Sequence, residues 1–242
     1  MISVCIATYN GAAYIGEQLK SIVDQLSADD EIIISDDNST DDTLKIVKSI
    51  ATTAKIKIVK GPCLKSSIAN FEHALKTAQG DYIFLADQDD IWMPDKVAIM
   101  MEALQTADCV VSDCTVTDGQ LNETQASFYA LNNTKAGLWH NLLIKNGYLG
   151  CCMAFKRDVC QCTLPFPKGI PMHDIWIGNV AAVFFKTQFI PERLIKFRRH
   201  QSTSSCTART SPYTLTQKMK FRWVILSQLI KLYFKRKTQR HH

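Results

Sequence analysis

Residues 82–96 read Tyr82-Ile83-Phe84-Leu85-Ala86-Asp87-Gln88-Asp89-Asp90-Ile91-Trp92-Met93-Pro94-Asp95-Lys96. The apolar run at residues 82–86 predicts a buried strand, and the polar residues after it predict a turn. Pro94 then begins a predicted helix over residues 94–106, because proline is favoured in the first helical turn. Asp87 and Asp89 therefore lie where a strand ends and the chain must turn.

The same alternation of strand and helix runs through the first half of the chain. Apolar runs predict strands at residues 2–7, 31–35, 56–60, 82–86 and 109–112. Apolar spacings of three and four predict helices at residues 14–25, 41–50 and 66–77, before the helix that begins at Pro94. This order predicts an α/β fold, with a mostly parallel sheet covered by helices on both faces.

Three of the predicted strand ends are unusually polar, and ligands of such sheets bind at the carboxyl ends of strands. The polar runs are Thr8-Tyr9-Asn10-Gly11, Asp36-Asp37-Asn38-Ser39 and Asp87-Gln88-Asp89-Asp90. Turn formation and helix capping explain Asn38 and Ser39. They do not explain adjacent carboxylates, which repel each other, at two ends of one sheet. We therefore expect a ligand site at this edge.

The second half of the chain is less regular. Residues 115–138 are polar and predict a surface loop over the site. A strand is predicted at residues 150–155, a helix at 174–184 and a last strand at 192–197. At 242 residues, 46% hydrophobic and 21% charged, the chain is of ordinary globular composition and is long enough for one sizeable core.

Charge and cysteine usage indicate the surroundings of the protein. None of the 23 acidic residues follows Glu192, whereas 13 of the 28 Lys and Arg residues do, so the basic tail is expected to meet a polyanion. The nine cysteines form no C-x-x-C pair, which indicates reduced thiols. Neither a charged leader nor an apolar run of the ~20 residues of a membrane span is present, so we expect a cytoplasmic location.

The basic tail, residues 206–242, is expected to be separate from a domain at residues 1–205. Over residues 218–237 it predicts a helix with an apolar, aromatic-rich face and a basic rim. Such a helix suits an anionic membrane surface, but it is equally consistent with a helix packed on the domain. Nucleic acid is not expected as a partner, because the apolar face is richer than a phosphate-tracking arm needs.

Asp87 and Asp89 supply the oxygen ligands that hard cations such as Mg²⁺ and Mn²⁺ prefer. Such a cation bridges one or two protein carboxylates to the phosphates of a substrate. It neutralises the negative charge that grows on a departing diphosphate. Alone, this pair of carboxylates is weak evidence for a metal site. Its position after three predicted strands and a second carboxylate pair strengthens that evidence.

The order of the motifs resembles the family-2 glycosyltransferases of GT-A fold. The resemblance rests on the three polar strand ends, on Gly150 to Phe155, on His173-Asp174-Ile175-Trp176 and on Phe197-Arg198-Arg199-His200, and it covers residues 1–205. Within this family the chain is most similar to rhamnosyltransferase-like enzymes of bacterial surface-polysaccharide assembly. Gln88 departs from the small or acidic residue of many members, which puts the identity of the donor sugar in doubt and not the fold.

The resemblance implies a role for each matching residue. The nucleotide is expected to bind Thr8, Tyr9, Asn10, Asp36, Asp37 and Asp87, and a basic segment of Arg198, Arg199 and His200 is expected to close over its diphosphate. Asp87 and Asp89 are expected to hold Mn²⁺ or Mg²⁺. Asp174 is expected to be the single catalytic base, although a carboxylate stabilised by a helix N-terminus explains it equally well from sequence alone. His173 is interpreted as structural or as a support for the residues that contact the ligand, and not as catalytic.

The resemblance also implies partners and a place. The expected reaction, in O-antigen or capsule biosynthesis, is inverting transfer of a sugar from a nucleotide-diphosphate donor to a hydroxyl of a glycan acceptor. The resemblance implies that this acceptor is lipid-linked. The expected location is peripheral, on the inner face of the plasma membrane. Two alternatives stay open: a phosphatase or phosphotransferase with an aspartate nucleophile, and a non-catalytic nucleotide-binding scaffold docked on a membrane.

Overall fold

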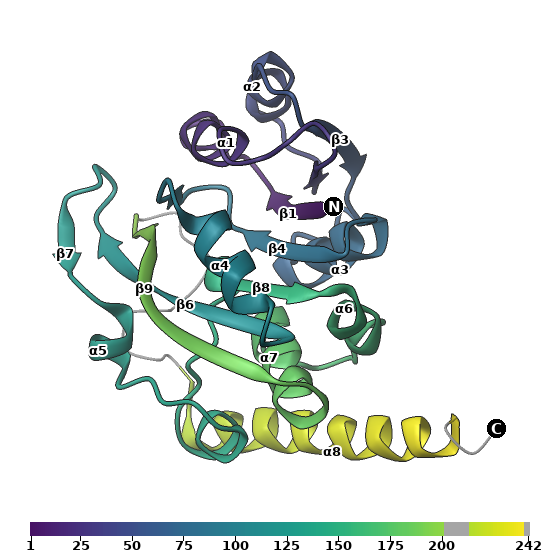
Figure 1. Ribbon diagram of the computed structural model, residues 1–242. Coiled ribbons are helices and arrows are strands. Elements are labelled where there is room, and N and C mark those ends of the chain that lie inside the picture. The colour runs from purple at the N-terminus through teal and green to yellow at the C-terminus, as the bar shows by residue number, and fades with distance from the viewer. Residues whose placement is uncertain (201–212, 240–242) are drawn as a thin grey trace.

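In the computed structural model, which describes residues 1–200 and 213–239, the chain folds around one mixed sheet (Figure 1). Its strand order is β3-β2-β1-β4-β8-β6-β9-β5, with β7 paired to β6. The amino-terminal half of the sheet is parallel, as the alternating pattern predicts. Its strands are β1 (Ile2–Thr8), β2 (Glu31–Asp36), β3 (Lys55–Lys60) and β4 (Tyr82–Ala86).

The other half of the sheet contains antiparallel pairs. Its strands are β5 (Ile91–Trp92), β6 (Cys109–Thr117), β7 (Glu123–Gln125), β8 (Met153–Lys156) and β9 (Thr187–Arg198). Strand β8 runs antiparallel between β4 and β6, whereas β6 and β9 are parallel. Both faces of the central strands are buried, which explains why they read as continuous apolar runs.

Helices lie on both faces of the sheet, with α4 in front of it and α7 behind it in Figure 1. The helices are α1 (Ile15–Val23), α2 (Thr43–Ser49), α3 (Ser67–Thr77), α4 (Lys96–Leu104), α5 (Phe128–Asn132), α6 (Arg157–Thr163), α7 (His173–Phe184) and α8 (Leu215–Gln239). Two short helical turns, η1 (His140–Ile144) and η2 (Gly150–Cys152), precede β8. The helices predicted from the first half of the sequence are all present, each slightly shorter than predicted.

Residues 115–138 differ from the predicted surface loop. Strand β6 continues through the first of them, and β7 and α5 follow. The cause is the buried carboxylate of Asp113, which accepts hydrogen bonds from the Ser127 hydroxyl (2.5 Å) and the Tyr129 backbone N–H (2.9 Å). These two bonds fix the start of α5 against β6, and neither can be read from local sequence patterns.

The predicted strand at residues 150–155 is also only partly correct, because its first three residues form the η2 turn. A Cβ atom at Gly150 would lie 2.8 Å from Nε2 of His173, closer than real Cβ atoms come to other atoms. Glycine therefore lets the η2 backbone pass directly beside the first residue of α7. This close approach brings the two segments of the predicted site together.

Helix α8 is packed on the domain through one face. Ile225 and Leu229 are buried in a small hydrophobic cluster with Leu142 of η1 and with Trp176 and Val180 of α7. The packing alternative for the tail helix is therefore correct for this face of α8. The predicted boundary between residues 205 and 206 lies outside the described residues. Among those described, no helix combines the length and the apolarity needed to cross a membrane.

Candidate functional site

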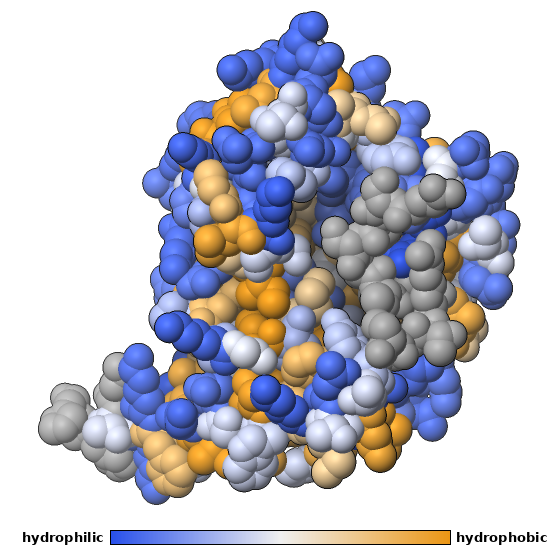
Figure 2. Space-filling view, turned by 180° about the vertical axis from the view of Figure 1, so that it is seen from behind, coloured by the Kyte–Doolittle hydropathy of each residue, from blue (hydrophilic) through white to orange (hydrophobic). Residues whose placement is uncertain are grey.

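A cavity of about 840 Å³ opens at the carboxyl ends of β1, β2 and β4. The predicted site residues that line it are Thr8, Tyr9, Asp37, Asp87, Asp89 and Asp174. Figure 2 shows this face hollowed above α8, with hydrophobic side chains beside the hollow. The volume is in the range of small-molecule sites in proteins. Three separate strand ends and the first turn of α7 therefore converge on one cavity, as the sheet topology predicts.

The turn after β2 is built by Asp36. Its carboxylate accepts hydrogen bonds from the Thr8 hydroxyl (2.8 Å), the Ser39 hydroxyl (2.6 Å) and the Ser39 backbone N–H (2.9 Å). Both carboxylate oxygens are thus engaged within the turn, and Asp36 does not line the cavity. Its neighbour Asp37 does line it, and the Asp37 carboxylate is buried, with a hydrogen bond from the Leu64 backbone N–H (3.2 Å). Asp36 therefore supports the loop from which Asp37 reaches the cavity.

The loop after β1 is connected to the loop after β4 by Gln88. The Gln88 amide accepts a hydrogen bond from the Tyr9 backbone N–H (2.9 Å) and donates one to the Tyr9 carbonyl (3.2 Å). A Cβ atom at Gly11 would lie 2.4 Å from the Gln88 Oε1, so this contact requires glycine. Asn10 lies beside it in a left-handed conformation and bonds the Thr40 backbone N–H (2.8 Å) outside the cavity lining.

Three carboxylates crowd the centre of the cavity. Burial, followed by the charges of Asp89 and Asp174, raises the pKa of Asp87 to about 8. A bound cation relieves the repulsion between crowded carboxylates, so these oxygen donors fit a hard divalent metal. Asp89 contacts His200, with 2.8 Å between the carboxylate Oδ2 and the imidazole Nε2. Asp87 and Asp89 both line the cavity, where the phosphates of a ligand can reach them.

A second set of close donor atoms belongs to Asp87, Asp90 and Cys151. Asp90 and Cys151 are buried behind the cavity wall, where Asp90 accepts a hydrogen bond from the Arg198 backbone N–H (2.9 Å). Burial also raises the pKa of the Cys151 thiol, and a protonated thiol is a poor ligand for a hard cation. Asp87 and Asp89 therefore stay the better predicted ligands, and Asp90 fixes β9.

Lys96, the last residue of segment 82–96, is fully buried behind the carboxylates of the cavity. Its Nζ donates to the Cys151 carbonyl (3.1 Å) and lies 4.9 Å from the centre of the Trp92 ring. The side chain thereby ties the segment after β4 to the η2 turn, which contacts α7. Lys96 supports the geometry between the predicted metal ligands and the predicted base.

Asp174 lies in the first turn of α7, at the wall of the cavity. Its carboxylate accepts hydrogen bonds from the backbone N–H groups of Gly150 (3.1 Å) and Ile175 (2.7 Å). Burial raises its pKa to about 6, and the two backbone bonds limit this rise. A carboxylate with this pKa is ionised at neutral pH and is close in basicity to what general-base catalysis requires.

His173 belongs to the cavity wall, which sequence patterns did not indicate. Its ring stacks on Phe71 with 4.0 Å between ring centres, and burial lowers its pKa to about 3. Within the described structure, neither ring nitrogen has a hydrogen-bond partner. The imidazole is therefore neutral and presents its polar atoms next to Asp174. The one available signal was its position beside the predicted base.

Residues 3–164 match the family model of Glycosyl transferase family 2. The chain belongs to this family. The dTDP-rhamnosyl transferase RfbG of Shigella flexneri is 39% identical over 116 residues, which cover 45% of this chain and 40% of that protein. The Escherichia coli UDP-Glc:alpha-D-GlcNAc-diphosphoundecaprenol beta-1,3-glucosyltransferase WfaP is 36% identical over 106 residues, covering 44% and 42%.

The aligned segments thus span less than half the length of these two relatives. Solved structures show the same GT-A fold. Staphylococcus aureus TarS in complex with UDP-GlcNAc superposes with a TM-score of 0.69 at 17% identity, covering 97% of this chain and 72% of TarS. The mannosyltransferase PcManGT of Pyrobaculum calidifontis, in complex with GDP-Man and Mn²⁺, gives 0.65 at 18% identity, covering 95% and 64%.

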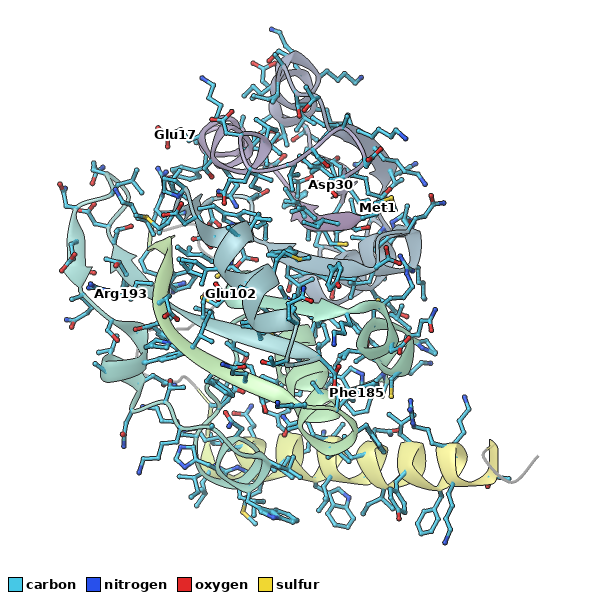
Figure 3. All side chains as sticks on the ribbon, viewed as in Figure 1. Met1, Glu17, Asp30, Glu102, Phe185 and Arg193 are labelled. Carbon is cyan, nitrogen blue, oxygen red and sulfur yellow. The ribbon has the colours of Figure 1, made fainter. Side chains whose placement is uncertain are left out.

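The predicted basic segment of this family-2 glycosyltransferase lies at the end of β9. The Arg198 guanidinium donates to the carboxylate of Glu17 in α1 (2.6 Å; Glu17 is labelled in Figure 3). It also lies over the Tyr14 ring, and Arg198 does not line the cavity. Arg199 extends the pairing between β9 and β6, because its backbone N–H donates to the Thr117 carbonyl (2.9 Å). His200 reaches Asp89, so the segment approaches the carboxylates through His200. Contacts of all three residues with a diphosphate stay a prediction.

Proposed function

We propose that this family-2 glycosyltransferase performs metal-dependent, inverting transfer of a sugar from a nucleotide-diphosphate donor to an acceptor hydroxyl. The observation that carries the proposal is that Asp174 lines the same cavity as Asp37, Asp87 and Asp89. The cavity thus combines carboxylates suited to a cation with one carboxylate suited to a base. The names of two bacterial relatives, a dTDP-rhamnosyl transferase and a glucosyltransferase, support sugar transfer. The proposed process is bacterial surface polysaccharide biosynthesis, of the O-antigen or capsule type.

Asp87 and Asp89 would hold Mn²⁺ or Mg²⁺, and the Mn²⁺ bound in PcManGT supports this assignment. The cation would stabilise the negative charge that develops on the leaving diphosphate. Thr8, Tyr9, Asp37 and Asp87 line the side of the cavity where the nucleotide is proposed to bind. Asn10 and Asp36 would act through the loops that they hold in place.

Asp174 would accept the proton of the acceptor hydroxyl as its oxygen attacks the anomeric carbon from the side opposite the diphosphate. Attack from that side inverts the anomeric configuration. The two backbone N–H groups that bond Asp174 hold its carboxylate in one orientation. Because a bound metal would help the diphosphate to leave, no second protein acid would be required.

The two alternative functions are less well supported. The phosphatase or phosphotransferase alternative is less well supported because this chain matches Glycosyl transferase family 2 over residues 3–164. A non-catalytic scaffold has no need for a base with a raised pKa at the cavity wall. The presence of Asp37, Asp87, Asp89 and Asp174 in one cavity favours an active enzyme.

Donor binding tests the proposal directly. We expect one nucleotide-diphosphate sugar from a panel that includes dTDP-rhamnose and UDP-glucose to raise the melting temperature with Mn²⁺ or Mg²⁺, because a ligand of the native state stabilises it. The rise should disappear in excess chelator. The bound donor should then release its nucleoside diphosphate when the acceptor is added, and the product should have the opposite anomeric configuration. Release of inorganic phosphate from a phosphomonoester instead would support the phosphatase alternative.

The location is proposed to be the cytoplasmic face of the plasma membrane, with α8 lying on an anionic membrane surface. The outer face of α8 exposes large apolar side chains, and rings project from the side of the helix that faces away from the domain (Figure 3). The exposed residues are Leu215, Met219, Trp223, Ile230, Tyr233 and Phe234. Basic residues on the same helix would add attraction to anionic lipid.

Vesicle binding tests this location. Trp223→Ser, alone and together with Met219→Ser, is expected to weaken binding to vesicles of anionic phospholipid by roughly tenfold or more, because burying one large apolar side chain contributes about 1.5 to 3 kcal/mol. Co-sedimentation at two salt concentrations measures it, with Leu64→Ser as control for an exposed apolar side chain outside α8. Deleting α8 is a poorer test, because it would uncover Trp176 and Val180. Unchanged binding of both outer-face variants would contradict this location.

A further inference from the structure

Most charged side chains of the cavity are separated by sign, and an exception is Lys65, which lies beside Tyr9 at the carboxylate end. Asp37, Asp87 and Asp89 follow strands of the parallel half of the sheet, whereas Lys218 and Arg222 lie on α8, at the opposite edge of the molecule (Figure 1). Lys145, which directly follows η1, lines the cavity on the same side as α8. Among the described residues that η1 and α8 contribute to the lining, none is acidic. This end of the cavity therefore attracts anions.

The three cations of this end are held by packed elements. Ile225 and Leu229 fix α8 on α7, and Arg222 donates from Nη2 to the Ile144 carbonyl (3.0 Å), which joins α8 to the end of η1. Lys218 is half-buried, whereas Lys145 is exposed at the rim. Lysine and arginine at a concave site are suited to phosphate, since charge-assisted hydrogen bonds are stronger than neutral ones.

Apolar side chains surround these cations. Leu142, Phe221 and Ile225 line the adjacent cavity wall, and Trp139 and Ile144 of the η1 region are 65% and 67% exposed. The outer face of α8 continues this apolar surface through Leu215. Contact with these apolar side chains does not stabilise a free phosphate. An anionic group attached to an apolar chain contacts both the cations and the apolar surface.

We propose that Lys145, Lys218 and Arg222 bind the diphosphate of an acceptor in which this group joins the glycan to an apolar chain, with the chain lying against η1 and α8. The inference rests on the proposed function, because it defines the class of acceptor. The glycan would then extend from the diphosphate toward Asp174, while the nucleotide occupies the other end of the cavity.

Binding of farnesyl diphosphate in excess chelator tests the site, because without metal the carboxylate end repels a diphosphate. We expect binding that a saturating nucleotide does not displace, and that is weaker for farnesol and for inorganic diphosphate. Lys145→Gln together with Lys218→Gln should weaken it by about tenfold or more, since each hydrogen bond to a charged group is individually strong. Lys145→Gln alone should weaken it less and, at an exposed position, should leave the fold intact.

The control is Lys20→Gln together with Lys48→Gln, which removes the same charge from exposed positions on α1 and α2, away from α8 (Figure 1). An equal loss in this control would overturn the site, because it would indicate attraction to overall charge. Displacement by nucleotide would also overturn it, and so would equally tight binding of inorganic diphosphate. Each readout is independent of transfer, so failure of the site is distinguishable from failure of the proposed function, which the donor panel measures.

Discussion

Asp89→Asn is expected to lower transfer by on the order of 10²- to 10³-fold and to weaken metal-dependent donor binding, because a cation on a leaving diphosphate contributes several kcal/mol. The substitution keeps the shape of the side chain and a hydrogen-bonding partner for His200, so the melting temperature without ligand should change little. Initial rates over a range of Mn²⁺ concentrations measure the effect. The rate deficit should shrink as Mn²⁺ is raised, if the variant still binds metal weakly through Asp87.

Two controls isolate the metal. Asp95→Asn removes an exposed carboxylate from the same segment, whose side chain makes no capping hydrogen bond to α4, and it should leave donor binding unchanged. Cys151→Ala removes a member of the buried donor set, and metal affinity should again be unchanged if the ligands are Asp87 and Asp89. Loss of metal affinity in Cys151→Ala, or full activity of the unmodified chain in excess chelator, would show that the metal assignment is wrong.

Asp174→Asn is expected to lower kcat by on the order of 10²- to 10⁴-fold while donor affinity stays nearly unchanged, because it removes the one proton acceptor at the proposed point of attack. Asparagine keeps an acceptor oxygen for only one of the two backbone N–H groups, because Gly150 and Ile175 bond different oxygens of the carboxylate, so the melting temperature of the variant must be measured alongside its rate. Single-turnover rates, together with donor binding by thermal shift, separate chemistry from affinity. The matched control is Asp158→Asn, an exposed carboxylate in the first turn of α6.

The pH dependence of kcat/KM gives a second readout for the same residue. The base must be ionised, and burial raises the pKa of Asp174 to about 6, so the rate should fall as pH drops below about 6. Above that value the Asp174 carboxylate is ionised, so at saturating metal this group should cause no further change in rate. The acid limb should be absent from the residual activity of Asp174→Asn. A variant that loses donor affinity as severely as turnover would instead indicate that Asp174 has a binding or folding role.

Local sequence was sufficient for much of the fold and for part of the site. The parallel half of the sheet was predicted because its buried strands are short apolar runs, and each is followed by an amphipathic helix. Asp37, Asp87 and Asp89 were predicted to meet because parallel strands place their carboxyl ends at one edge. The family resemblance was confirmed by the match over residues 3–164, while the roles that it implies for single residues stay predictions.

Other features needed the tertiary structure, because they depend on contacts between segments far apart in the chain. Asp36 and Asp37 are adjacent residues with the same side chain, so local sequence does not distinguish them. In the fold, the Asp36 carboxylate is bonded within the turn after β2, whereas Asp37 lines the cavity. Arg198 is predicted to contact the diphosphate, and only the folded chain shows that its guanidinium also bonds Glu17 of α1. The short β7 and α5 were missed for the same reason, since Asp113 of β6 anchors α5.

The sequence by itself determined the α/β order, the polar strand ends and the amphipathic character of the tail helix, because periodicity and turn chemistry are local properties of a chain. Only the tertiary structure decided which face of α8 is buried, that His173 and Asp174 share a wall with Asp87, and that Lys145 lines one cavity end with Lys218. Those relations follow from packing, in which Gly150 admits the His173 ring and Ile225 and Leu229 seat α8 on α7. Side-chain volume and burial, summed over distant segments, set such contacts, and no local pattern encodes them.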